Sequence, residues 1–172
     1  MAIDTVAALL DALRGSPILR PDQYAELVAR YAVDFPEPQD LARHLIKLRW
    51  LTVYQAKKIL AGKTSELVIG HYTVLDKLGE GGMGRVYKAQ HLTLERPIVL
   101  KMLHKTLSTD EATVQRFHRE AKAASRLNHP NSIAVLDFGQ SEDGTLFMAM
   151  EYLPGRDLGR LLAEEFPDRK SN

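Results

Sequence analysis

The spacing of apolar residues changes once along the chain, near residue 66. Up to residue 62, apolar side chains recur every three or four positions, which is the spacing of one face of a helix. Four short amphipathic helices are predicted: over residues 3–14, over residues 21–31 with Pro21 in the first turn, around Leu41, Leu45 and Leu48, and over residues 53–61. Thr52 is expected to cap the last helix and Gly62 to end it. None is long enough to be stable alone, so they must pack on one another or on a partner.

From residue 67 the pattern is that of strands. Runs rich in Val, Ile and Tyr cover residues 67–69, 72–78, 85–90, 97–103, 133–138 and 145–152, and the turn "SEDG" separates the last two. One helix interrupts them; Ser108 and Glu111 have the spacing of a capping box before it. Its apolar stripe is Val114, Phe117, Ala121, Ala124 and Leu127. The predicted class is α+β, with a helical bundle over residues 1–62 and a linker over 63–66.

Composition narrows the function classes. The 172 residues are 45% hydrophobic and 26% charged with a net charge of +1, which gives no general electrostatic reason to bind nucleic acid or a membrane. The absence of cysteine excludes disulfides, thiolate metal sites and a cysteine nucleophile. No apolar run approaches the roughly 20 residues of a membrane helix. The first residues, "MAIDTVAALLDALRG", carry acids where a signal peptide is basic. We therefore expect a soluble, cytoplasmic protein.

A glycine-rich stretch, "KLGEGGMGRVYKA", joins two strand-like runs. A dinucleotide-binding crossover would instead open a helix with these glycines, and a P-loop would end in Gly-Lys-Ser/Thr. A glycine-rich hairpin can fold over phosphates and bring backbone N–H groups close to them. The alternative is a merely flexible hairpin.

Two charged residues add to this pattern. Lys101 lies in the apolar run "PIVLKML", where its charge would be costly unless it meets an anion such as a phosphate. Glu120 follows Phe117 by three positions, so it could face the sheet and hold Lys101. The alternatives are a lysine on the solvated face of an edge strand and an ordinary surface glutamate.

In order, "LGEGGMGRVYKA", "VLK", a helix with "RE", "HPN" and "MEYLPG" resemble the protein-kinase small lobe, specifically bacterial Ser/Thr protein kinases of the GxGGMGxVY type. The resemblance covers about residues 67–165, leaving 166–172 as a tail, and it implies a five-stranded antiparallel sheet with the family's helix C. The leader resembles, more loosely, the region preceding the kinase domain in some planctomycete-type bacterial kinases.

The resemblance implies ATP and Mg²⁺ as cofactors and a set of nucleotide-binding residues. The implied residues are Gly79, Glu80, Gly81, Gly82, Met83 and Gly84 in the loop, Val86 against adenine, Lys101 on the α- and β-phosphates, Glu120 as its helix partner, Met150 as gatekeeper, Glu151 and Leu153 in the hinge, and Asp157 at the ribose. Val99 stands where the family usually has alanine, so the adenine pocket could be tighter.

Residues Asp137, Phe138 and Gly139 spell "DFG" but precede the expected hinge, and no His-Arg-Asp lies upstream. We expect them at the end of a strand that runs into the "SEDG" turn. The resemblance assigns no catalytic residue and no metal ligand to these 172 residues. They are therefore expected to bind ATP weakly and to lack kinase activity alone.

Three functional interpretations stay open: a piece of a longer kinase, a stand-alone pseudokinase-like signalling module that dimerises or binds a partner, and a helical bundle that works while the lobe serves as scaffold. Self-association is expected through apolar residues that a large lobe would cover, namely Leu127, Val135, Met148 and Met150.

The short connection favours a bundle docked on the lobe, with a regulatory or dimerising role. Trp50 and Tyr54 could contact the lobe or a partner, or belong to the bundle core. A helix-turn-helix DNA reader is the rival, resting on Arg43, Lys47, Arg49, Lys57 and Lys58. Charges over residues 1–66 nearly balance, which argues against it because phosphate contacts need a basic face.

Overall fold

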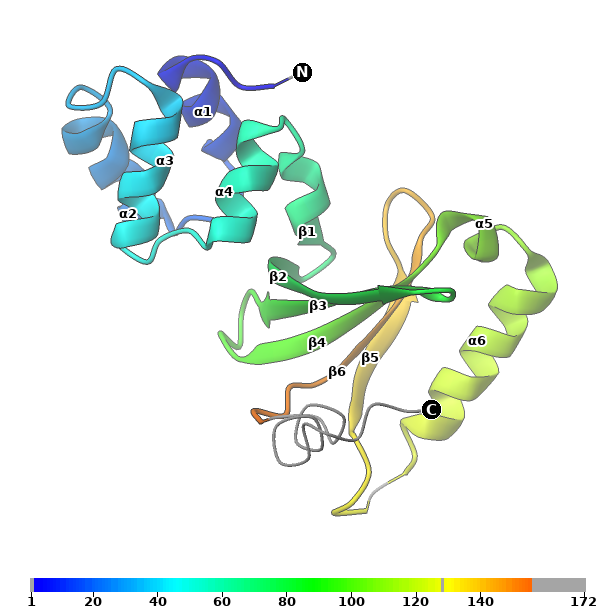
Figure 1. Ribbon diagram of the computed structural model, residues 1–172. Coiled ribbons are helices and arrows are strands. Elements are labelled where there is room, and N and C mark those ends of the chain that lie inside the picture. Colours follow the sequence, from blue (N-terminus) through cyan, green and yellow to red (C-terminus); the bar gives the residue numbers. More distant parts are fainter. Residues whose placement is uncertain (1, 128, 156–172) are drawn as a thin grey trace, which may run out of the picture.

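The protein is described by a computed structural model that covers residues 2–127 and 129–155. The helical part comprises α1 (Val6–Leu13), α2 (Pro21–Glu26), a π-helical turn η1 (Leu27–Tyr31), α3 (Pro38–Lys47), α4 (Val53–Leu60) and a 3₁₀ turn η2 (Thr64–Leu67) (Figure 1). The four predicted helices are therefore confirmed. Helix α1 begins later than predicted because Thr5 caps it, accepting a hydrogen bond from the Ala8 N–H. The predicted cap of α4 by Thr52 is present.

The rest of the described chain is built around one antiparallel sheet. Its strands are β1 (Val68–Ile69), β2 (Tyr72–Gly81), β3 (Gly84–His91), β4 (Pro97–Leu103), β5 (Val135–Gln140) and β6 (Leu146–Glu151), in the order β1-β2-β3-β4-β6-β5. The family resemblance implied five strands, whereas this sheet has six. Val68 and Ile69 turn at Gly70, which has a φ of 54°, and pair with the start of β2.

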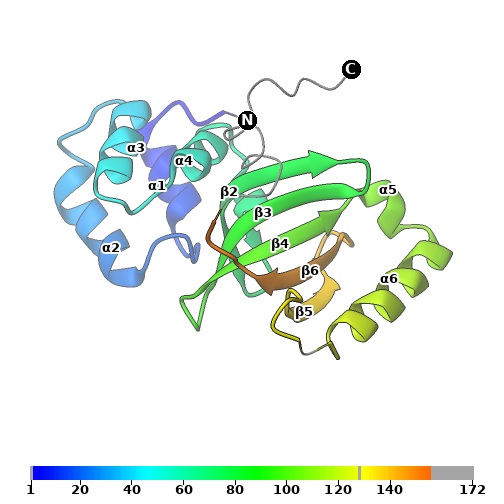
Figure 2. The ribbon, with the colours of Figure 1, turned by 60° about the horizontal axis from the view of Figure 1, so that its bottom comes forward.

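Two helices connect β4 to β5. Helix α5 (Lys105–Ser108) is short, and α6 (Glu111–Ala124) runs beside β5 (Figure 2). The predicted capping box of α6 is wrong. Its cap is Asp110, whose carboxylate accepts from the Thr113 N–H at 2.8 Å. Ser108 is instead buried at the end of α5, where its hydroxyl accepts from the Leu146 N–H at 3.1 Å and so ties this segment to β6.

The apolar stripe of α6 is only partly used. Phe117 and Ala121 are buried, and His118 meets the Phe138 ring of β5 edge-on at 5.9 Å between centroids. Leu127, beyond the end of the helix, is 63% exposed. Helix α6 therefore contacts the sheet chiefly at β5, and it does so with a narrow part of its own surface.

The sheet curls so that one face closes on itself. Tyr72 of β2 packs edge-on against Phe147 of β6, with 5.9 Å between ring centroids, and its hydroxyl donates to Asp137 of β5 at 2.9 Å. The cross-strand row Tyr87, Leu100 and Ala149 is buried on this inner face. Strands far apart in the sheet order are thereby held together by side chains.

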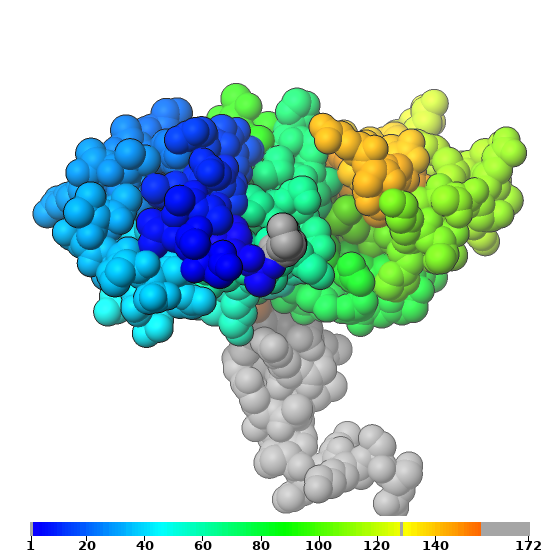
Figure 3. Space-filling view, turned by 90° about the horizontal axis from the view of Figure 1, so that it is seen from above, coloured from blue at the N-terminus to red at the C-terminus, as the bar shows by residue number. Residues whose placement is uncertain are grey.

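The helical part is docked on the sheet, as the short connection predicted. One continuous buried core contains Leu27 and Ile59 from the helices and Val74 and Leu100 from the strands. Helix α4 packs on β2, and Figure 3 shows the two parts abutting in one surface.

Tyr54 and Trp50, whose contacts the sequence left undecided, lie in different surroundings. Tyr54 of α4 lies 6.3 Å, ring centroid to centroid, from Tyr87 of the sheet. Trp50 packs edge-on against Tyr31 inside the helical part, at 5.9 Å. Tyr54 therefore contacts the sheet, whereas Trp50 is half-buried and packs against the core through its contact with Tyr31.

Candidate functional site

The outer face of the sheet carries the residues singled out in the sequence. Strand register places Val86, Lys101 and Met148 in one cross-strand row and Lys88, Val99 and Met150 in the next. All six are half-buried, whereas most side chains of the inner face are fully buried. The result is a half-exposed apolar surface with two lysines, in which Lys101 lies between Val86 and Met148 and Lys88 lies beside Val99.

A glycine hairpin extends from this face. Strands β2 and β3 pair up to Gly81 and Gly84, with Gly82 and Met83 at the tip, and Met83 is 69% exposed. No atom lies within 4 Å of a Cβ built at Gly79, Gly81 or Gly82, so the space beside the backbone of these glycines is open. Such a surface lets a ligand approach the backbone N–H groups closely.

Glu80 links the two strands of the hairpin. Its carboxylate accepts hydrogen bonds from Lys77 on the same strand and from Arg85 Nε of β3 at 3.1 Å. These two hydrogen bonds lower the pKa of Glu80 to about 2, and the bond from Lys77 has the larger effect. The carboxylate is therefore charged throughout the neutral range, and its side chain is engaged within the hairpin.

A histidine holds the hairpin from the end of β4. His104 Nε2 lies 2.9 Å from the Gly81 carbonyl oxygen, and its backbone N–H donates to the Met83 carbonyl at 3.2 Å. Nothing in the sequence pattern singled out His104, because this contact joins residues 23 positions apart.

Lys101 and Glu120 are not brought together. Lys101 projects from the open face between Val86 and Met148, while Glu120 is exposed on α6. Among the described residues, neither charge takes part in an ion pair. The expected pair is absent because α6 packs through Phe117 and Ala121 onto β5, away from β4.

The hinge side of the face is partly occupied. Glu151 pairs with the chain before β5, since its N–H donates to the Ala134 carbonyl at 3.0 Å and its Oε1 accepts from the Ala134 N–H at 2.7 Å. Leu153 is exposed, and Asp157 lies outside the described residues. A contact missed in the sequence is that of Lys88, whose Nζ lies 4.6 Å from the centroid of the Tyr152 ring.

Asp137 lies inside β5, so its expected position in a strand before the "SEDG" turn is confirmed. It accepts a hydrogen bond from Tyr72, and burial, together with that bond, raises the pKa of Tyr72 above its usual range. In residues 2–127 and 129–155, no group of three or more His, Asp or Glu side chains is arranged so that it could hold a metal ion.

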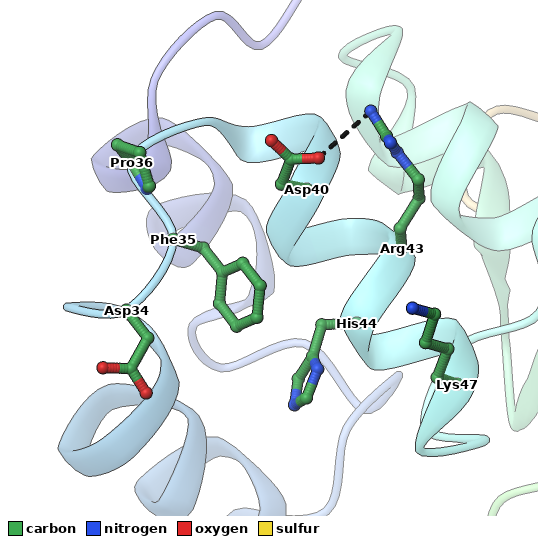
Figure 4. Close-up of a pocket in the computed structure, with 7 residues that line it drawn as sticks. All are labelled: Asp34, Phe35, Pro36, Asp40, Arg43, His44 and Lys47. Atoms are coloured by element: carbon green, nitrogen blue, oxygen red, sulfur yellow. Dashed lines mark ion pairs between the residues drawn. The ribbon is translucent and has the colours of Figure 1, made fainter.

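The helical part has a hollow of its own, of about 430 Å³ (Figure 4). Phe35 and His44 line it, with their ring centroids 4.8 Å apart. Arg43 pairs with Asp40 at 3.1 Å, and Asp34 and Lys47 are further charged residues of the lining. Charges of both signs therefore line it. No helix within the described ranges has the length and apolarity to cross a bilayer.

Known proteins match the sheet-bearing part. A family model described as protein kinase domain matches residues 72–171. Serine/threonine-protein kinase pkn3 of Myxococcus xanthus is 62% identical over 96 residues, covering 56% of this chain and 18% of the relative. Serine/threonine-protein kinase PrkC of Bacillus subtilis is 36% identical over 100 residues, covering 58% and 15%.

A solved structure agrees with these matches. The PknI kinase domain of Mycobacterium tuberculosis superposes with a TM-score of 0.52 at 37% identity, covering 58% of this chain and 39% of that one. The chain thus spans about a fifth or less of the length of these curated relatives. By these matches the chain belongs to the protein kinase family, and its sheet and α6 correspond to part of the kinase domain of bacterial Ser/Thr kinases.

Proposed function

We propose that residues 67–165 form the ATP-binding small lobe of a Ser/Thr protein kinase. The observation that carries this proposal is the open face on which Val86, Val99 and Met150 surround an apolar surface beside Lys101, next to a hairpin with a bare glycine backbone. An apolar surface fits the adenine ring of ATP, while a lysine and the closely approachable backbone of a glycine hairpin fit the phosphates of ATP. The relatives that match this part of the chain are named as Ser/Thr kinases, which supports the proposal.

The proposed roles are those that the family resemblance implies. Adenine would lie against Val86 and Val99, with Met150 behind it and hinge groups of Glu151 and Leu153 at its edge. Lys101 would meet the phosphates beneath the residues Gly79 to Gly84. Pairing of Lys101 with Glu120 would require α6 to approach β4, a movement that the narrow contact of α6 permits.

We further propose that residues 1–172 alone bind nucleotide without transferring its phosphoryl group. Transfer needs metal ligands and a group that positions the attacking hydroxyl. The "DFG" aspartate is engaged with Tyr72 within β5, and the sequence has no His-Arg-Asp before it. Magnesium ligands and the catalytic base would come from kinase segments beyond these residues.

Titration calorimetry with ATP and Mg²⁺ tests the nucleotide proposal. We expect weak but measurable binding, and a Lys101→Ala variant that binds about ten- to a hundredfold more weakly, because a charged hydrogen bond contributes about 1.5–3 kcal/mol. Lys57→Ala, an exposed position on α4, is the matched control and should bind like the parent chain. No heat at millimolar ATP, or equal affinities of all three chains, would contradict the proposal.

A self-associating module is the second candidate. Of the residues expected to be uncovered, Leu127 is exposed, while Val135, Met148 and Met150 are half-buried. Ile133, just before β5, and Leu136, within β5, are exposed as well, so this part of the chain presents further apolar side chains to solvent. Light scattering over a hundredfold concentration range should show dimers that Leu127→Lys weakens; a monomer throughout would exclude this candidate.

A further inference from the structure

The strand that leads into the glycine hairpin is irregular at Leu75. Val74 pairs with Ala89 and Asp76 pairs with Lys88, so Leu75 is left without a partner on β3. A second shift follows between Lys77 and Gly79. Bulges of this kind bend a strand and increase its twist, so they decide the direction in which the strand continues.

The helical part supplies hydrogen bonds at the first bulge. Gln55 Nε2 donates to the Val74 carbonyl at 2.9 Å, and Thr52 Oγ1 donates to the Leu75 carbonyl at 2.6 Å. Gln55 is only 3% exposed, so water cannot readily replace its bond. Buried carbonyl groups need such partners, because leaving one unsatisfied is unfavourable.

The same two side chains also begin helix α4. The Gln55 N–H donates to Thr52 Oγ1 at 3.1 Å, and the Thr52 N–H donates to Gln55 Oε1 at 2.9 Å. The amide oxygen of Gln55 therefore serves the helix, and its amide nitrogen serves the strand. Glutamate would satisfy the capping box equally well, but it has no donor for Val74.

We propose that Gln55 is a positioning residue for the glycine hairpin, acting with Thr52 on the bulge at Val74 and Leu75. By holding the bulge, it sets the direction in which β2 carries Gly79 and Gly81 toward the open face above Lys101. The positioning of the hairpin by Gln55 and Thr52 is inferred from these contacts alone, whereas an effect on ATP affinity rests on the proposed function. Through this contact, the helical part influences the nucleotide site although it contributes no residue to it.

Amide hydrogen exchange of the nucleotide-free chain tests the proposal with Gln55→Glu, which keeps the capping acceptor and removes the donor. We expect exchange over residues 76–86 to accelerate about tenfold, while β6 stays within twofold of the parent chain. ATP affinity should fall in the same variant. Thr52→Asp, which still accepts from Gln55 but cannot donate to Leu75, should act in the same direction and serves if Gln55→Glu does not fold.

Gln23→Glu is the matched control. Gln23 occupies the same capping position in α2, where its Oε1 accepts from the Arg20 N–H at 3.0 Å, and it makes no hydrogen bond to the sheet among the described residues. An unchanged hairpin in both folded variants, an equal acceleration in Gln23→Glu, or one spread evenly over β6 would overturn the proposal. If exchange accelerates in the Gln55→Glu variant but the parent chain does not bind ATP, the positioning role stays intact and only the nucleotide proposal is refuted.

Discussion

Replacing Gly84 by alanine is expected to lower the free energy of unfolding by about 3 kcal/mol, a large effect for one methyl group. A Cβ at this position would lie 1.9 Å from the Met102 carbonyl oxygen and 2.9 Å from the Leu103 Cα. Both are backbone atoms of β4, so no side-chain rotation relieves the overlap. A φ of 154° adds strain for any residue with a side chain. Urea unfolding followed by circular dichroism measures the effect.

Gly82→Ala is the control for this substitution. It lies two residues away in the same hairpin, and a Cβ there meets no atom within 4 Å. Its stability should stay within about 0.5 kcal/mol of the parent chain. Equal losses from the two substitutions would show that flexibility of the hairpin, rather than close approach of β3 to β4, explains the glycine at position 84.

Leu100→Ala is expected to destabilise the helical part as well as the sheet. Leu100 is fully buried in β4, and its core is continuous with that of Ile59 in α4. Truncating a buried leucine removes about 2–5 kcal/mol of stability. Trp50, the one tryptophan of the sequence, lies in the helical part and reports its unfolding by fluorescence. The fluorescence and circular-dichroism transitions in urea should therefore shift together.

The contrary result is easily recognised. If the two parts unfold independently, the Trp50 transition will stay in place while the sheet transition moves to lower urea concentration. Val33→Ala, at a highly exposed apolar position before α3, is the control and should shift neither. The outcome also bears on any experiment that removes residues 1–62, because a shared core predicts that the sheet would not remain intact without them.

Local patterns in the sequence predicted much of the fold. Helices α1 to α4 follow from the periodic apolar residues, and the cap of α4 from Thr52, because these signals act within a few positions. The cap of α6 shows the limit of such signals. Ser108 had suitable spacing, but its buried hydroxyl accepts a hydrogen bond from the Leu146 N–H, and Asp110, two residues later, is the cap.

The candidate site divides in the same way. The glycine hairpin and the row containing Val86 and Lys101 were predictable, because strand alternation and family motifs place them. The separation of Glu120 from Lys101 was not, since it depends on how α6 packs on β5. Equally hidden were the contact of His104 with the hairpin and that of Lys88 with Tyr152.

By itself, the sequence determined the kinds of element, their order and the family, because apolar periodicity, caps and glycine positions act over short stretches of chain. Only the tertiary structure decided that the helical part shares a core with the sheet, that Tyr72 engages the "DFG" aspartate, and that Gln55 supports the strand before the glycines. These contacts join residues 19 to 65 positions apart. They depend on which buried polar groups and apolar surfaces meet once the chain has folded, and no short sequence pattern encodes that meeting.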